Sequence, residues 1–163
     1  MDAVEGTKDV TVARRSAMLW PLAMSTWNSL GTHRYYCEMD LLFVELHGDM
    51  GLDDVRRLWP IAESIEQACG YVITVFDARD SKSVNPEARR YVGEKNRKRT
   101  LVGPVLVVGA GFAMRTITLL LQQAARVFGK RPASVHFCAM MEGLPPLLAA
   151  QRQAFAPSLS RQH

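Results

Sequence analysis

Short runs of β-branched and aromatic residues alternate with longer stretches of helical period along this chain, and this alternation constrains the fold more than any other feature. The clearest run is YVITVF (71–76), which is apolar on both faces, as in a parallel strand buried between two layers. Strands that alternate with helices in this way favour right-handed crossovers and a mainly parallel sheet with packed helices. The sequence therefore predicts a single α/β domain.

The expected elements follow the order β-β-α-β-α-β-α-β-α. The strands are expected at 33–38, 41–48, 71–76, 102–110 and 133–140, and the helices at 51–70, 85–99, 112–129 and 144–155. Only Met39 and Asp40 separate the first two strands, a length that suits an antiparallel hairpin whose first strand lies at an edge of the sheet. Pro60 removes a hydrogen bond from the first helix, so we expect a bend there or a later helix start.

Length and composition fit one domain. With 163 residues, of which 48% are hydrophobic and 22% charged, the chain can bury one sizeable core. We expect an N-terminal extension over 1–28, mobile or lying against the domain, the domain itself over 29–157, and a C-terminal tail over 158–163. No run approaches the roughly 20 apolar residues of a membrane span, and the acidic start is a poor secretory signal, so the expected location is the cytoplasm.

Charge and cysteine content exclude several function classes. The net charge of +4 is small and spread along the chain, so it does not indicate nucleic-acid binding. Wide cysteine spacing argues against a disulfide framework and a metal site, and we expect Cys37, Cys69 and Cys138 to be buried small hydrophobes. Histidines on or beside the strands have no serine or carboxylate at a recognisable motif spacing, so a catalytic triad is unsupported. They are His33, His47 and His136.

The stretch VFDARDSKSVNPEARR (75–90) connects the buried strand to the next helix. In a parallel sheet, surfaces for ligands and partners lie beyond the carboxyl ends of the strands. Asn85 is a favoured N-cap residue, Pro86 fits the first helical position, and Glu87 adds negative charge at the positive end of the helix dipole. We therefore expect a loop from Asp77 to Asn85 and a helix that begins after it.

The order of strands and helices, the LHGDM that ends the second strand, and the VFDARDSKSVNPEARRY junction resemble the STAS family (sulfate transporter and anti-sigma-factor antagonist) in its SpoIIAA-like branch. The resemblance covers Gly31 to Phe155, and its motifs are short. It implies a STAS fold and a bacterial regulatory protein without catalytic groups. The implied partner is a protein, either an anti-sigma-factor-like kinase or another signalling protein, and a homodimer is compatible with it.

Members of that family typically carry an Asp-Ser-Ser-Gly run at this helix start, where a partner kinase phosphorylates a serine. The helix N-terminus stabilises the added phosphate, whose charge of about −2 then disrupts an interface. In this chain the run falls on Asn85, Pro86, Glu87 and Ala88. None of these side chains accepts a phosphoryl group, so the resemblance implies a module without the usual phosphoacceptor.

Other residues of the junction have two readings each. Ser81 and Ser83 are either displaced phosphoacceptors or serines that satisfy the backbone of a loop. Glu87 either imitates a phosphate or stabilises the first helical turn by about 0.3–1 kcal/mol. Asp77 and Asp80 either form a pair of carboxylates or hydrogen-bond the loop backbone. In each case the second reading is the more common one.

The stretch VVGAGFAMR (107–115) invites comparison with dinucleotide-binding loops, because Gly109 and Gly111 follow a strand and open a helix. Met114 stands where the third glycine belongs, and no acidic residue ends a following strand, so no cofactor is expected. The glycines more readily serve a tight turn. With Arg115 nearby, the helix N-terminus is a candidate anion site.

The densest positive charge lies in and after the helix that follows the junction. Its members are Arg89, Arg90, Lys95, Arg97, Lys98 and Arg99. One interpretation is that this run contacts phosphate groups or an acidic protein face. The other is that its last four members balance the negative end of the helix dipole.

The leading hypothesis is a non-catalytic interaction module that docks a protein partner. The expected interaction surface comprises Asp77, Arg79, Asp80, Ser81, Ser83, Asn85, Glu87, Arg89 and Arg90. The alternative is a domain that binds a nucleotide or an apolar small molecule in a pocket beyond the carboxyl ends of the strands.

Overall fold

The computed structural model describes residues 26–97, 103–111, 115 and 134–159. Its elements are β1 (Asn28–Leu30), β2 (His33–Glu38), β3 (Leu41–Met50), α2 (Leu52–Cys69), β4 (Ile73–Val84), α3 (Pro86–Arg97), β5 (Val105–Val108), β6 (Val135–Cys138), the 3₁₀ turn η2 (Met141–Gly143) and α5 (Leu144–Leu159). The helix expected at 112–129 lies, apart from Arg115, outside the described residues, as do most of the N-terminal extension and the last residues of the tail.

The strands form one six-stranded sheet in chain order, β1-β2-β3-β4-β5-β6. β1, β2 and β3 pair antiparallel, whereas β3, β4, β5 and β6 pair parallel. The predicted α/β class, a mainly parallel sheet with an antiparallel N-terminal hairpin, is therefore confirmed.

The strand at 33–38 was expected at an edge of the sheet. This prediction is wrong, because β1 pairs along the outer side of β2. The Trp27 ring explains this addition: its centroid lies 4.9 Å from that of Tyr36 and 6.0 Å from that of Phe43, both edge to face. This packing holds the chain against β2, so Trp27 and Asn28, assigned to the extension from the sequence, lie on the sheet.

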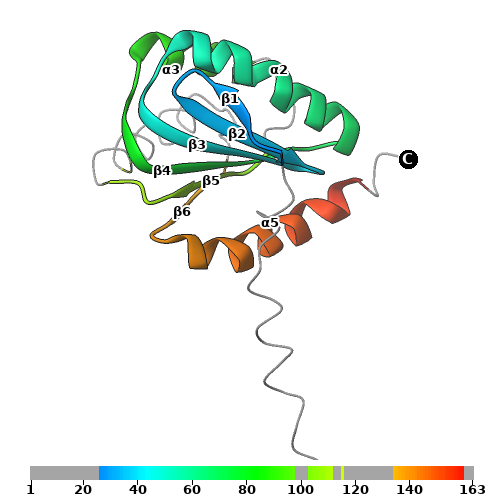
Figure 1. Ribbon diagram of the computed structural model, residues 1–163. Helices are drawn as coiled ribbons and strands as arrows, with labels where there is room; N and C mark the ends of the chain where they lie inside the picture. Colours follow the sequence, from blue (N-terminus) through cyan, green and yellow to red (C-terminus); the bar gives the residue numbers. More distant parts are fainter. Residues whose placement is uncertain (1–25, 98–102, 112–114, 116–133, 160–163) are drawn as a thin grey trace, which may run out of the picture.

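Helices cover both faces of the sheet (Figure 1). α2 and α3 lie on one face and α5 lies on the other. Alternation along β3 supplies both cores, because Leu42, Val44 and Leu46 point toward α2 while Leu41 and Phe43 point toward the α5 face. Within the described ranges, every helix is too short or too polar to serve as a membrane span.

Helix α2 begins where its sequence signals place it. The Asp54 carboxylate accepts a hydrogen bond from the Gly51 backbone N–H at 2.9 Å, and Gly70 ends the helix at φ 79°. The alternative of a start after Pro60 is wrong, because the helix runs from Leu52 through that residue. Pro60 lies on the exposed side of this helix.

Helix α5 is tied to the β2–β3 turn by a buried carboxylate. Asp40 accepts hydrogen bonds from Arg152 Nε at 3.0 Å and from the Tyr71 hydroxyl at 2.8 Å. Burial alone would raise the pKa of Asp40, but the hydrogen bonds from Arg152 and Tyr71, with the charge of Arg152, outweigh burial and lower it. Burial and the neighbouring Asp40 raise the pKa of Tyr71 to about 12. These pKa shifts favour an ionised Asp40 and Arg152 beside a neutral Tyr71.

The cysteines are less buried than expected. Cys69 and Cys138 are half-buried and Cys37 is exposed, and all three thiols are free. Cys37 pairs with Leu42 close to the hairpin turn, at a rim of the sheet where Met39 is also exposed. The expectation of buried small hydrophobes is thus wrong for Cys37.

Candidate interaction surface

The segment expected as a loop after 71–76 is the second half of a long strand. β4 runs from Ile73 to Val84 and pairs with β3 as far as Met50↔Val84, whereas its pairing with β5 ends at Asp77↔Val108. The ladder with β3 satisfies backbone groups that a loop would leave to water or side chains. β4 therefore projects beyond β5 and turns at the rim of the sheet into α3 (Figure 1).

Two register shifts let this projecting half follow β3. They lie between Glu45 and His47 and between Gly48 and Asp49, and Gly48 has a φ of 76°. Bulges of this kind bend a strand and redirect its side chains. The exposed residues from Arg79 onward therefore sit on a curved ribbon rather than on a flat sheet edge.

The start of α3 agrees with its sequence signals. The Asn85 side-chain oxygen accepts a hydrogen bond from the Glu87 N–H at 2.7 Å, and the Asn85 carbonyl accepts one from Arg89 N–H at 3.0 Å. Pro86 is the first helical residue, and Ala88 is fully buried. The described side chains at this helix start thus carry no hydroxyl.

Asp77 and Arg79 form a clamp at the point where β5 stops pairing. Arg79 Nε and Nη2 donate to the Asp77 carboxylate at 2.9 and 2.6 Å, and the Arg79 backbone N–H donates to it at 3.2 Å. The Asp77 side chain is only 4% exposed, whereas that of Arg79 is 57% exposed. These hydrogen bonds and the negative charge raise the pKa of Arg79. A buried carboxylate thus holds an exposed cation in one orientation.

Gly109 makes room for this clamp. Its φ is 68°, and a Cβ atom at this position would lie 2.2 Å from Arg79 Cγ. A side chain at residue 109 would therefore collide with the arginine stem in addition to straining the backbone. The glycine predicted to serve a tight turn does so, and it also determines where Arg79 lies.

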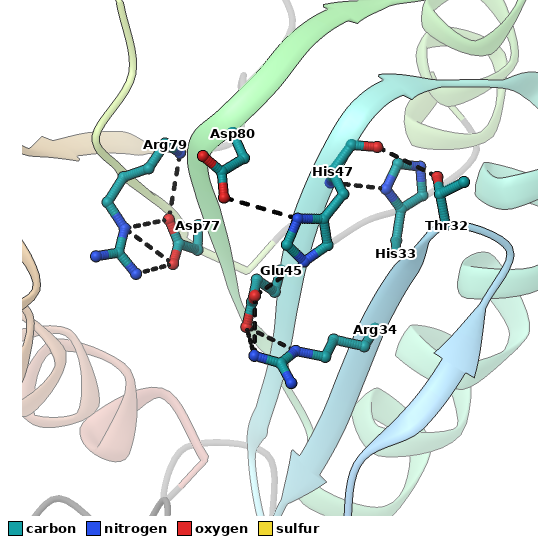
Figure 2. Close-up of polar contacts among 8 residues, drawn as sticks. All are labelled: Thr32, His33, Arg34, Glu45, His47, Asp77, Arg79 and Asp80. Atoms are coloured by element: carbon teal, nitrogen blue, oxygen red, sulfur yellow. Dashed lines mark hydrogen bonds and ion pairs between the residues drawn. The ribbon is translucent and has the colours of Figure 1, made fainter.

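A row of charged side chains continues from the clamp across β3 and β2 on the α5 face (Figure 2). Arg34 Nε donates to the Glu45 carboxylate at 2.9 Å, and Glu45 Oε1 lies 2.9 Å from His47 Nε2. His47 Nδ1 lies 3.7 Å from an oxygen of Asp80, whose side chain is 74% exposed. Basic and acidic side chains therefore alternate along this row, which is a complementary pattern for a polar partner surface.

His33 contacts the backbone of this row at His47. Its Nδ1 accepts a hydrogen bond from the His47 backbone N–H at 3.0 Å, and its other ring nitrogen, Nε2, is on the side of Asp54. That nitrogen lies 3.5 Å from Asp54 Oδ2, and the His33 side chain is fully buried. The spacing of these histidines along the sequence does not support a catalytic triad. The structure gives His33 a structural role and places His47 on the surface.

The two candidate phosphoacceptor serines differ in environment. Ser83 is exposed, and its hydroxyl donates a 2.6 Å hydrogen bond to the Asp49 carboxylate. Ser81 is half-buried, and its hydroxyl oxygen has no partner within the described part of the chain. Of the two, Ser83 is the more exposed residue, although its hydroxyl lies beside a carboxylate that disfavours added negative charge.

Residues 89 and 90 of α3 are exposed arginines, and Lys98 and Arg99 lie outside the described residues. The Lys95 ammonium lies 5.6 Å from the centroid of the Tyr91 ring, so this part of the run is packed on the helix itself. Arg89 and Arg90 are therefore exposed cations of α3 that follow the projecting end of β4, which itself carries the exposed Lys82.

The candidate anion site contains an arginine that is already engaged. Arg115 Nε donates to the Ala110 carbonyl at 2.9 Å, and its guanidinium carbon lies 5.8 Å from the centroid of the Phe137 ring. Gly111 is open, with nothing within 4 Å of an added Cβ. Over the described residues, histidine, cysteine and acidic side chains nowhere gather in a group able to hold a metal ion.

Comparison with known proteins gives a likeness of fold. No family model and no curated protein matches the chain. The anti-sigma factor antagonist SpoIIAA in its unphosphorylated form is similar with a TM-score of 0.48 and 6% identity, over 76% of this chain and 97% of that chain. An uncharacterized protein with a SpoIIAA-like fold from Shewanella loihica is similar with a TM-score of 0.46 and 15% identity, over 76% and 91%. These likenesses carry over no residue's role to this chain.

Proposed function

We propose that this chain is a non-catalytic, SpoIIAA-like regulatory module that docks a protein partner at the rim where β4 passes into α3. We call this surface the docking face. It comprises Asp77, Arg79, Asp80, Ser81, Ser83, Asn85, Glu87, Arg89 and Arg90. The observation that carries the proposal is the clamp, because a cation held by a buried carboxylate loses little side-chain entropy when a partner binds it.

The surroundings of the clamp support a protein partner. Asp80 and Arg79 are both exposed and of opposite charge, and Arg89 and Arg90 follow within one turn of α3. Mixed charges on a rigid rim give specificity and a fast association rate more than raw affinity. A signalling protein with complementary charges, such as an anti-sigma-factor-like kinase, fits this surface, and its docking takes place in the cytoplasm.

We further propose that docking is not switched at the start of α3. Asn85 uses its side-chain oxygen to cap the helix, and Glu87 supplies negative charge in the first turn. Phosphopeptide mass spectrometry on protein from its own host tests this point. We expect residues 85–88 to be unmodified, and modification of Ser81 or Ser83 would restore a switch in the projecting half of β4.

A pull-down from host extract tests the docking face. The bait is the full chain, compared with an Arg89→Glu/Arg90→Glu variant. The matched control is Arg56→Glu/Arg57→Glu, which reverses the same charge on exposed neighbours of α2. We expect a partner that the control retains and the α3 variant loses. Identical partner lists for all three baits would refute the docking face.

A further inference from the structure

An apolar cavity of about 310 Å³ lies between the sheet and the helices α2 and α3. It is not beyond the strand ends, where the sequence suggested a small-molecule pocket, but beneath the helices. Most of its lining is aliphatic or aromatic, and includes Leu46, Leu58, Trp59, Val84, Val92 and Val107. Protein interiors rarely contain voids much larger than a water molecule, so this cavity is unusual. Its volume is at the lower end of the range for small-molecule binding sites.

The polar lining is confined to few residues, and two of them lie on α3. Arg89 and Asn96 are separated by two helical turns and line the cavity together with Val92 between them. This stripe is about 10 Å long at 1.5 Å per residue. Within the described lining, Thr74 is a further polar residue. The cavity thus has an apolar interior with a charged group toward one end.

Arg89 is positioned to receive an anion. Its side chain makes no hydrogen bond or ion pair with the part of the chain that the structure describes, although it borders an apolar space. It lies in the first turns of α3, near the positive end of the helix dipole. Among the described residues that line the cavity, none is acidic. A cationic or highly polar ligand would lose its hydration there without compensation.

We infer that this cavity binds a single-chain aliphatic carboxylate. The hydrocarbon lies between α2, α3 and the sheet, and the carboxylate pairs with Arg89 at the N-terminal end of α3. A nucleotide does not fit this chemistry, because its sugar and phosphates need more polar partners than Arg89, Asn96 and Thr74 provide. The inference shares Arg89 with the docking face but needs no protein partner, and it adds a small ligand to the proposed module.

Isothermal titration of the full chain with dodecanoate, below its micelle concentration, tests the site. The matched ligand is dodecyltrimethylammonium, which has the same chain and the opposite charge. We expect one dodecanoate per chain and at least roughly tenfold weaker binding of the cation, since one charge-assisted contact is worth about that factor. Absence of dodecanoate binding, or equal binding of the two ligands, would overturn the inference.

Two variants locate the ligand. Arg89→Met keeps the apolar stem and should weaken dodecanoate binding roughly tenfold. Arg97→Met removes an exposed charge of the same helix that does not line the cavity, and should change binding by less than about twofold. Equal effects of the two substitutions would place the ligand elsewhere and refute the site.

Ala62→Phe projects a ring into the cavity and should abolish dodecanoate binding, with urea unfolding used to confirm that the variant is folded. If the folded Ala62→Phe protein binds as the parent does, the cavity is not the site. The alternative occupant is a second copy of this chain, which light scattering detects. If the parent is a dimer that binds no dodecanoate, and the Val92→Asp variant is a monomer, this surface is a self-association site and the inference is refuted.

Discussion

The clamp predicts unequal effects when either of its two residues is replaced. Arg79→Met leaves the Asp77 carboxylate, whose side chain is 4% exposed, without its cation. Asp77→Asn leaves the Arg79 guanidinium, which is 57% exposed and remains hydrated. Because the cost of breaking an ion pair depends on how well water can replace the lost partner, the arginine substitution should destabilise the fold more.

The magnitudes follow from the burial of each partner. Removing one partner of a buried pair costs about 3–5 kcal/mol. Asp77 retains the hydrogen bond from the backbone N–H of residue 79 at 3.2 Å, so we expect the Arg79→Met variant to lose about 2–3 kcal/mol. Asp77→Asn keeps an acceptor oxygen and should cost about 1 kcal/mol.

Urea unfolding at neutral pH measures both values. The matched control is Arg56→Met, because the Arg56 side chain is 56% exposed while its partner Asp53 is 90% exposed. That substitution should change the unfolding free energy by less than about 0.5 kcal/mol. Equal losses for the Arg79 and Asp77 variants, or a loss for Arg56→Met as large as that for Arg79→Met, would refute the asymmetry argument.

Four further outcomes test parts of the structure. Gly109→Ala should destabilise by about 2 kcal/mol or more in urea unfolding, because of its φ of 68° and the contact with the residue 79 stem, whereas Gly93→Ala in α3, with open space at its Cβ, should stabilise by about 0.5–1 kcal/mol. Asn85→Ala should cost about 1 kcal/mol by removing the helix cap, and an unchanged unfolding midpoint would deny it that role. Since the folded-state pKa of Tyr71 is raised to about 12, its contribution is present below pH 10 and is lost as the pH rises toward 12, so Tyr71→Phe should remove this part of the alkaline loss. The pKa of Asp40 is lowered in the folded state, so its contribution to stability is present above the ordinary carboxyl pKa. This contribution is lost as the pH falls through the folded-state pKa, and Asp40→Asn should abolish that acid loss.

Much of the fold follows from local signals. The two-residue turn at Met39 and Asp40 predicts the hairpin, and the same turn sets its register, from Glu38↔Leu41 to Arg34↔Glu45. Residues directly opposite on antiparallel strands interact, so the Arg34 and Glu45 pair was accessible to this reasoning although spacing along the chain did not suggest it. Continued alternation from Glu45 to His47 is the signal that would have extended the row.

Other features depend on contacts that local sequence does not encode. The stretch from Asp77 to Val84 has the composition of a loop, but pairing with β3 makes it a strand. β1 is only three residues long, and the ring of Trp27 on Tyr36 and Phe43 is what brings it to the sheet. In both cases a long-range partner overrides local propensity.

Site-specific photocrosslinking in the host tests the docking face most directly. A photoreactive residue replaces Lys82, which is exposed on the projecting half of β4, and in a parallel strain it replaces Gln67, which is exposed on α2. We predict a discrete adduct with a protein partner from position 82 that is absent from position 67 and is lost when Arg89→Glu and Arg90→Glu are added. No adduct from position 82, or the same adducts from both positions, would contradict a docking face at this rim.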